Sequence, residues 1–339
     1  MIKKSFFALV AASFISLLIM SLPGCGGGTK NGQGTGFGFG YPGNSGGGGC
    51  PTCVSIYVDA TLGNDATGTG SASAPYKTIT KTIQVSSAVA ATQGANIYVA
   101  SGVYNAGGGE VFPIMPSTGD NLIGAGNVQV SGTGATYTKA AGDYAGMPLS
   151  YVMVFTPGVT GSMTGISLGG SAETIGIIGA TVTLTGNTFS GSTNVVLFAG
   201  SGAQLTLNSN TLNNGNLASV LVADAGTHVV ARGNVISGCA QYGVVVGPIT
   251  PISASAMDLG TVTSPGNNTI LGGATVTGVG LLIDWITAGT TIQAVGNTWH
   301  PSTQGADASG HYAATLIPPG TPAVAGNNYA NPANGSIQF

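Results

Sequence analysis

A glycine followed eight residues later by an asparagine recurs along this chain of 339 residues. The stretch GATVTLTGNTFSG, residues 179–191, shows the pattern, with strand-forming residues on both sides of Asn187. The six asparagines are Asn187, Asn210, Asn234, Asn268, Asn297 and Asn328, and their glycines are Gly179, Gly202, Gly226, Gly260, Gly289 and Gly320. Two further copies begin at Gly119, which leads to Asn127, and at Gly158, which leads to Ile166.

Apolar residues recur at fixed places in these copies, in alternation with polar ones. The third residue after the glycine is Val182, Leu205 or Val229 in three successive copies. The leading glycines are 21 to 39 residues apart, which is typical of a solenoid of short strands and turns. Such a unit buries its apolar face only by stacking on its neighbours. We therefore expect an all-β fold, a single-stranded right-handed parallel β-helix, with coils over residues 119–339.

The asparagine is expected at a bend between two strands of one coil. Asparagine tolerates the left-handed conformation that such a bend needs. In stacked coils the side-chain amides would hydrogen-bond to one another as a ladder along the axis. This predicts a structural role for the six asparagines and no catalytic one.

Composition excludes several classes of protein. Only 5% of the residues are charged, against about 25% in ordinary soluble domains, so the polar surface consists mostly of hydroxyls and amides. The mean hydropathy is too high for a disordered chain. Arg232 is the only arginine and no basic stripe exists, which argues against nucleic acid as a partner.

The N-terminal segment has the pattern of a secretory signal, with a basic start and an apolar run too short to span a membrane. Its end, Leu22-Pro23-Gly24-Cys25, resembles the lipobox of bacterial lipoproteins, in which the cysteine is lipidated. We therefore expect a lipoprotein signal peptide at 1–24, lipidation at Cys25, and an outer-membrane location, which Gly26 favours in that family. A plain secreted protein is the alternative. Residues 25–53 read as a flexible glycine-rich tether.

Three cysteines remain. Cys50 and Cys53 form a Cys-x-x-Cys pair, which is either a thioredoxin-like motif or a local disulfide. The disulfide is favoured because the chain is predicted to be exported and no βαβ pattern surrounds the cysteine pair. Cys239 follows an apolar strand and is expected to be a small buried hydrophobe.

Residues 54–118 read as an N-terminal cap region, and 54–339 as the β-helix domain. An amphipathic helix is expected near Ile79 to Ala90, followed by a strand over Asn96 to Ala100. The most distinctive motifs are Tyr57-Val58-Asp59, Gly63-Asn64-Asp65, Ala74-Pro75-Tyr76-Lys77-Thr78-Ile79, Ile97-Tyr98-Val99-Ala100, Gly102-Val103-Tyr104 and Leu122-Ile123-Gly124. Together they resemble the cap of pectin-lyase-like proteins and, more narrowly, bacterial surface proteins classed as a domain of unknown function.

The loop from Asp59 to Asp65 raises the question of calcium. Carboxylates and an amide are suitable ligands for Ca²⁺. Two acids and Asn64 are few, however, so a hydrogen-bonded turn is favoured over a metal site. No other cofactor is expected.

The resemblance to pectin-lyase-like proteins implies two chemistries, β-elimination and acid-assisted hydrolysis, which need a base or a cluster of acids on one face. The acids of the coils are Glu173, Asp224, Asp258, Asp284 and Asp307, at different offsets and without an adjacent pair. Arg232 is expected to point outward, and a solvated surface residue is favoured over a contact with a sugar carboxylate.

Extra residues follow the asparagine strand in the longer copies. If they leave the stack at one corner, they form a row of loops that could make a sugar-binding groove. The groove candidates are Tyr137, Lys139, Asp143, Tyr144, Tyr242, His300, Asp307, His311 and Tyr312. The alternative is a set of irregular loops with surface histidines.

The sequence thus favours a lipid-anchored, non-catalytic envelope β-helix that binds glycans or surface partners, or that is structural. A polysaccharide lyase or a glycoside hydrolase remains the alternative.

Overall fold

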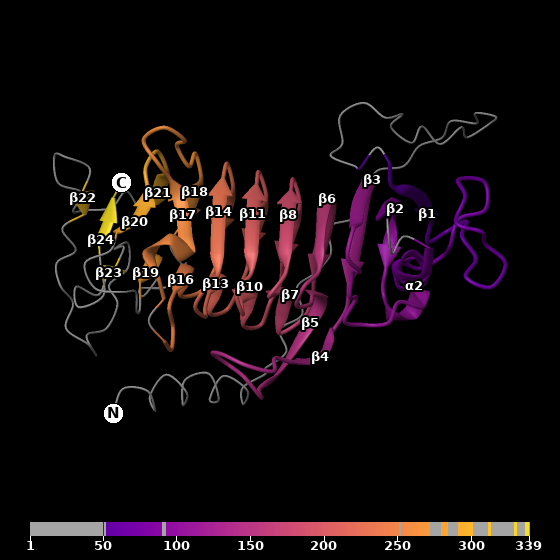
Figure 1. Ribbon diagram of the computed structural model, residues 1–339, viewed down its shortest axis with the longest axis horizontal. Helices are drawn as coiled ribbons and strands as arrows, with labels where there is room; N and C mark the ends of the chain where they lie inside the picture. Colours follow the sequence, from indigo (N-terminus) through magenta and orange to yellow (C-terminus); the bar gives the residue numbers. More distant parts are fainter. Residues whose placement is uncertain are drawn as a thin grey trace, which may run out of the picture. The chain divides into compact units, whose positions relative to one another are not determined.

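The computed structural model describes residues 50, 52–89, 93–250, 252–271, 279–283, 291–300, 311–312, 329–330 and 336–338. Its strands stack side by side along one axis, and α2 (Ile79–Val89) lies at the N-terminal end of the stack (Figure 1). Strands of successive coils pair in parallel. The protein is a parallel β-helix, as the repeat predicted.

One coil shows how the repeat folds. β7 (Glu173–Ile178) is followed by β8 (Thr181–Thr185) and by β9 (Thr188–Ser190). β10 (Val195–Gly200) then lies parallel to β7 and begins the next coil. The next strands repeat this order: β11 (Gln204–Asn208), β12 (Thr211–Asn213), β13 (Ala218–Val222), β14 (His228–Arg232), β15 (Val235–Ser237) and β16 (Tyr242–Val246).

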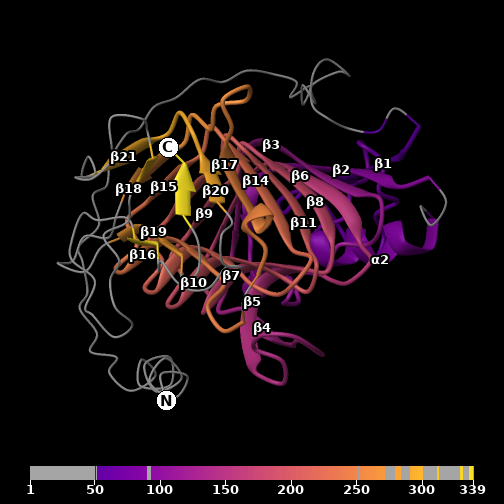
Figure 2. The same ribbon diagram turned by 60° about the vertical axis from the view of Figure 1, so that its left-hand side comes forward.

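Three faces enclose the interior (Figure 2). Face 1 consists of β5 (Pro148–Phe155), β7, β10, β13, β16, β19 (Val279–Ile283) and β23 (Tyr329–Ala330). Face 2 consists of β1 (Val54–Val58), the first halves of β2 (Ala95–Tyr104), β3 (Asp120–Ser131) and β6 (Thr160–Gly169), and of β8, β11, β14, β17 (Met257–Gly260), β20 (Thr291–Ala294) and β24 (Ser336–Gln338). Face 3 consists of the second halves of β2, β3 and β6, and of β9, β12, β15, β18 (Thr269–Leu271) and β21 (Thr298–His300).

The interior is filled by the alternate residues that the sequence pattern marked as apolar. Val182 and Leu205 are each 2% exposed and lie opposite one another on β8 and β11. Leu205 in turn lies opposite Val229 on β14. Because paired strands are about 4.8 Å apart, each buried side chain packs on the equivalent residue of both neighbouring coils.

Helix α2 covers the first coil. Its buried residues, Ile79, Thr82, Ile83 and Ser86, recur at the spacing of one helical face, and the two isoleucines join the interior core. The open end of a β-helix exposes strand edges and an apolar cross-section, so a covering helix prevents end-to-end association. The expected capping helix is confirmed.

The asparagines form a hydrogen-bonded ladder at the bend between faces 2 and 3. Asn187, Asn210, Asn234 and Asn268 are at most 1% exposed, and Asn297 continues the series. The side-chain oxygen of Asn234 accepts from the backbone N–H of Asn210 at 2.8 Å and from its amide at 3.1 Å. The same two bonds join each neighbouring pair of the series. Asn328 lies outside the described residues.

The conformation at this bend differs from the expectation. The left-handed residue is the one before each asparagine, such as Gly186 at φ +62° and Ser209 at φ +54°. None of the five described ladder asparagines has a positive φ. The residue before the asparagine therefore makes the sharp turn. The asparagine itself keeps a negative φ, and its side-chain amide points inward.

Two copies of the repeat are out of phase with the structure. In one copy, Leu122 is the third residue after Gly119 but lies opposite Met163, which is the fifth residue after Gly158. Asn127 of the same copy is exposed and lies outside the ladder. The ladder begins instead at the backbone N–H of Ile166, which donates to Asn187 at 3.0 Å. Gly260 ends β17, so Thr263 lies in the following turn and not in the inward column.

The insertions leave the stack at different corners. Residues 132–147 lie between faces 3 and 1, whereas residues 247–256 lie between faces 1 and 2. A third insertion, residues 261–267, lies at the bend before β18. The expectation of a single row of loops is therefore wrong for the described coils, because the repeat fixes the strands but tolerates extra residues at any corner.

Candidate functional site

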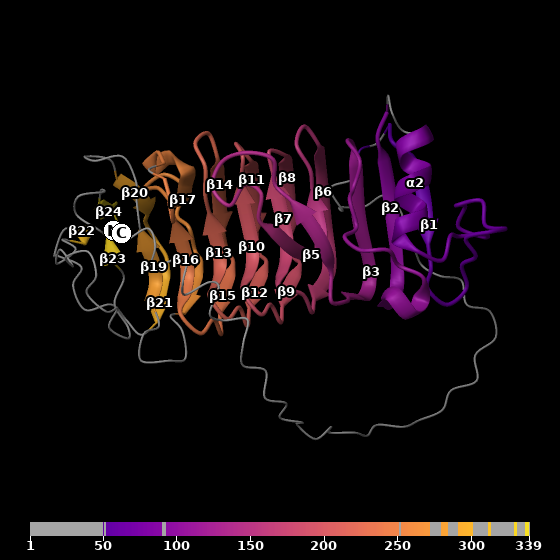
Figure 3. The ribbon, with the colours of Figure 1, turned by 90° about the horizontal axis from the view of Figure 1, so that it is seen from below.

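A hairpin covers part of the outer side of face 1. β4 (Ala135–Thr138) pairs antiparallel with β5, and residues 139–147 join them. We call residues 132–150 the hairpin; Figure 1 shows β4 beyond the stack of coils, beside β5. Figure 3 shows β7, β10, β13 and β16 of face 1 side by side.

The surface beneath the hairpin is apolar. Tyr151, Val154, Ile178, Val195, Phe198, Leu217, Ala218, Leu221, Ala223 and Val245 form a second buried cluster outside the interior core. Tyr137, Tyr144 and Leu149 of the hairpin pack against it, and the rings of Tyr144 and Phe198 meet edge to face at 5.8 Å. The strands β7, β10 and β13 are therefore buried on both sides, which explains their near-continuous apolar sequence.

The tip of the hairpin is held by a buried ion pair. The ammonium of Lys139 contacts a carboxylate oxygen of Asp224, and the two residues are 3% and 6% exposed. The same carboxylate accepts from the backbone N–H groups of Asp143 and Ser201. Asp143 in turn accepts from the backbone N–H and the hydroxyl of Thr250, at 3.2 Å and 3.0 Å.

An acid and a phenol lie buried at the opposite edge of face 1. Glu173 and Tyr151 are opposite one another on β7 and β5 and are 2% and 0% exposed. One carboxyl oxygen of Glu173 accepts from the Asn194 amide at 2.6 Å. Its other oxygen and the Tyr151 hydroxyl have no hydrogen-bond partner among the residues that the structure describes.

Burial in this environment raises the pKa values of both Glu173 and Tyr151. Burial raises the pKa of the Glu173 carboxyl from 4.5 to about 7, against the opposing effect of hydrogen bonds from Asn194 and from the backbone of Ser150. Burial also raises the pKa of the Tyr151 phenol, and the nearby Glu173 adds to that effect. At neutral pH this carboxyl is therefore divided between its neutral and ionised forms.

The outer side of face 2 carries polar side chains in register. One column runs through Asn96, Asn121, Ser162, Thr183 and Thr206 on successive coils. At its start the side chains touch, since Ser162 donates to Asn121 at 2.7 Å and Asn121 donates to Asn96 at 3.3 Å.

A second column of face 2 begins with Tyr57 and Tyr98, whose rings stack at 5.0 Å. It continues through Ile123, Thr164, Thr185 and Asn208. Face 2 thus presents hydroxyls and amides at regular intervals beside two partly exposed aromatic rings.

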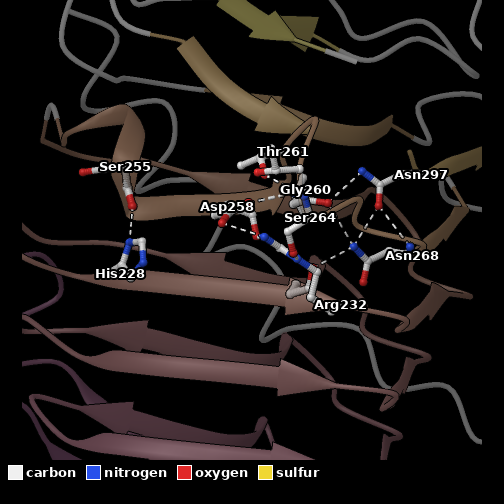
Figure 4. Close-up of polar contacts among 12 residues, drawn as sticks. His228, Arg232, Ser255, Asp258, Gly260, Thr261, Ser264, Asn268 and Asn297 are labelled. Atoms are coloured by element: carbon white, nitrogen blue, oxygen red, sulfur yellow. Dashed lines mark hydrogen bonds and ion pairs between the residues drawn. The ribbon is translucent and has the colours of Figure 1, made fainter. Parts of the chain in front are cut away.

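The charged groups of face 2 gather on β14 and β17 (Figure 4). Arg232 bonds to the Asp258 carboxylate at 2.7 Å and to the Ser264 hydroxyl at 3.2 Å. The other oxygen of Asp258 accepts from the backbone N–H of Gly260 at 2.8 Å, and a ring nitrogen of His228 contacts the backbone oxygen of Ser255. Arg232 points outward as expected, but it is ion-paired rather than solvated alone.

The nine groove candidates do not line one surface in the described residues. Lys139 and Asp143 are buried in the hairpin tip, Tyr137 and Tyr144 face the apolar cluster, and Tyr242 lies on β16 beside it. The backbone of His300 belongs to β21, and that of His311 and Tyr312 to β22 (His311–Tyr312), which pairs antiparallel with β24. Asp307 lies outside the described residues.

The N-terminal candidates are engaged within the chain. Cys50 and Cys53 form a disulfide, and Asn96 binds the backbone of Cys50 through both ends of its amide. Asp59 accepts from the backbone of its own turn, and Asp65 accepts from the backbone of Lys77 and from Thr78. Among the described residues no three acids, cysteines or histidines converge as a metal site.

Two further predictions concern the remaining cysteines, Cys239 and Cys25. Cys239 is a free thiol and fully buried, and burial raises its pKa to about 11. Cys25, the signal segment and most of the tether lie outside the described residues. In the part of the chain that the structure describes, no helix has the length and apolarity to cross a membrane.

A family model described as "Protein of unknown function (DUF1565)" matches residues 61–247, which run from the cap region to the end of β16. The chain belongs to this family. The match covers all of the motifs on which the narrower resemblance was based except Tyr57-Val58-Asp59, and that resemblance is confirmed. No curated protein matches the chain.

Solved structures similar to this DUF1565 chain include the following two. One is an alginate lyase from Paenibacillus sp. str. FPU-7, with 12% identity, a TM-score of 0.33, and coverage of 84% of this chain and 99% of that one. The other is the A-module of a mannuronan C-5 epimerase from Azotobacter vinelandii, with 13% identity, a TM-score of 0.31, and coverage of 65% and 82%.

The contacts that sequence reasoning missed in this DUF1565 protein join distant parts of the chain. Lys139 and Asp224 are 85 residues apart, and Glu173 meets a hairpin that precedes it by one coil. The one available signal was Glu173 itself, an acid at the start of an otherwise apolar strand.

Proposed function

We propose that this protein is a lipid-anchored envelope β-helix that binds polysaccharide through the outer side of face 2 without cleaving it. The observation that carries the proposal is the in-register column from Asn121 to Thr206, whose side chains are partly or fully exposed. Hydroxyls and amides repeated about every 4.8 Å along a rigid axis can hydrogen-bond to a long polyhydroxylated chain at many points. Individually weak contacts then add up, because each bound point holds the next one close.

The state of the acids supports a non-catalytic role. Every carboxylate that the structure describes accepts hydrogen bonds from the chain's own groups. These acids are Asp59, Asp65, Glu110, Asp120, Asp143, Glu173, Asp224 and Asp258. A general acid or base must lie within hydrogen-bond reach of the substrate, and six of these eight acids, all except Asp65 and Asp258, are at most 6% exposed.

The binding test compares two faces of the same coils. The variant Thr183→Val, Thr206→Val removes two hydroxyls from face 2 while keeping side-chain shape and strand propensity. The matched control, Thr188→Val, Thr211→Val, makes the same change on face 3. Cosedimentation with insoluble cellulose and chitin, and affinity electrophoresis in alginate, should show retention of the wild type and the control, and weaker retention of the face 2 variant.

Two results would count against the proposal. Equal retention of both double variants, or retention of none of the proteins, would remove face 2 as the binding surface. New reducing ends or unsaturated sugars after incubation with these polysaccharides would replace the binding role by the alternative, a polysaccharide lyase or hydrolase.

The anchor is tested separately. If Cys25 carries a lipid anchor, the wild type should be found in the membrane fraction of fractionated cells. A Cys25→Ala variant should be exported in soluble form, and globomycin should not affect its export. Membrane association that survives this substitution would exclude the anchor but leave the binding test unaffected.

A further inference from the structure

The hairpin is attached at both edges of face 1. Strands of face 1 run parallel and in register, so Glu173 at the start of β7 and Asp224 after the end of β13 lie at opposite edges. The ion pair of Lys139 and Asp224 holds the tip. At the base, Ser171 donates to the backbone oxygens of Thr133 and Ser150, at 3.1 Å and 2.7 Å.

Glu173 belongs to the base attachment. Its carboxyl receives hydrogen bonds from Asn194 and from the backbone N–H of Ser150, which lies on β5 within the hairpin. Its second oxygen is buried without a partner in the described structure. An ionised carboxylate in that position loses hydration that the closed hairpin does not replace, whereas the neutral acid loses much less.

The groups that face Glu173 supply no positive charge. They are the phenol of Tyr151 on β5 and the neutral amide of Asn194, and the phenols of Tyr137 and Tyr144 lie near that of Tyr151. The one buried ammonium of the hairpin, that of Lys139, is already paired with Asp224 at the other edge. Asp143, also at that edge, adds a second negative charge that Thr250 stabilises.

We propose that the hairpin is a pH-dependent cover, closed on face 1 while Glu173 is protonated and opened when Glu173 loses its proton. Opening lets water reach the carboxylate, and it uncovers the apolar cluster around Phe198 and Val154.

The sign and size of the effect follow from linkage. The pKa of Glu173 is about 7 in the closed state and returns toward 4.5 when the side chain is hydrated. Closure is therefore favoured most below pH 4.5, and the advantage is lost as the pH rises through 7. From pH 6 to pH 8.5 the opening equilibrium should increase about tenfold.

Hydrogen exchange of the full-length protein tests this directly. Exchange rates of amides in residues 133–150, corrected for the pH dependence of chemical exchange, should rise about tenfold from pH 6 to pH 8.5 in the wild type. A Glu173→Gln variant should show no such rise, because glutamine keeps the side-chain shape and an oxygen that accepts from the Asn194 amide but does not ionise. Peptides from β8 and β11 should keep constant protection in both proteins.

Tryptic cleavage after Lys139, measured relative to cleavage after the exposed Lys77, gives a second readout and should follow the same pH profile. Wild-type protection that does not change with pH would overturn the proposal, as would an equal change in Glu173→Gln. Loss of protection in β8 and β11 together with the hairpin would also overturn it, because that result means global unfolding.

Discussion

The Nδ2 of Asn210 lies 3.1 Å from the Oδ1 of Asn234 in the next coil, and it also donates to the backbone oxygen of Leu184 at 2.8 Å. Asn210 is thus bonded on both sides, since its own oxygen accepts from Asn187. The ladder satisfies backbone groups at every bend, where no strand pairing is available.

Replacing Asn210 by alanine should lower the free energy of unfolding by about 2–4 kcal/mol, because buried donors and acceptors in three coils lose their partners. Urea denaturation measures the change. The control is Asn216→Ala, an exposed asparagine in the same coil, with an expected effect within about 0.5 kcal/mol. Similar values for the two variants would contradict a stabilising ladder.

The ion pair of the hairpin should show strong coupling. Lys139→Met leaves Asp224 buried without its counter-charge and should destabilise the protein by about 3–5 kcal/mol. Asparagine fits position 224, whose φ is +68°, so the double variant Lys139→Met, Asp224→Asn should recover part of the loss. A double-mutant cycle in urea gives the coupling, and Lys77→Met, at an exposed lysine, serves as the control. Additive effects of the two single substitutions would refute the coupling.

Glu110 holds the N-terminus of α2 from 31 residues away. Its two oxygens accept from the backbone N–H groups of Ile79 and Thr80, at 2.7 Å and 2.9 Å. Glu110→Ala should destabilise the cap by about 1–2 kcal/mol, since the first turn loses its acceptors. Hydrogen exchange of residues 78–89 measures this, and Glu110→Gln, which keeps one acceptor oxygen, should lose less. Unchanged exchange in the alanine variant would exclude this capping role.

Asp120 joins α2 to the first coils and should make stability depend on pH. Its carboxyl accepts from the Ser117 N–H at 2.8 Å and from the Ser86 hydroxyl at 3.1 Å, and burial raises its pKa from 3.8 to about 6. The folded state therefore favours the protonated acid. That contribution is complete below pH 3.8 and is lost as the pH rises through 6, to a maximum of about 3 kcal/mol.

Asp120→Asn should remove this pH dependence and stabilise the protein at pH 8 relative to the wild type. Thermal unfolding at pH 4, 6 and 8 checks both statements. A variant that is as pH-dependent as the wild type between pH 4 and 7 would show that Asp120 is not the responsible group.

Local pattern was enough to predict the architecture. The spacing of Gly179 and Asn187, repeated with apolar residues in between, specifies a coil because a strand buries alternate residues and a turn needs a permissive backbone. The capping helix was also predictable, because the residues that it buries recur at helical spacing.

The sequence by itself therefore determined the stack of coils, the inward asparagines and the polar outer side of face 2, all of which depend on contacts between equivalent residues one coil apart. Only the tertiary structure decided the position of the hairpin. Insertions have no repeat partner, so nothing near Lys139 or Asp143 in the chain indicates that they meet Asp224 and Thr250. The same holds for Glu173, whose acidity depends on the burial that this distant contact creates.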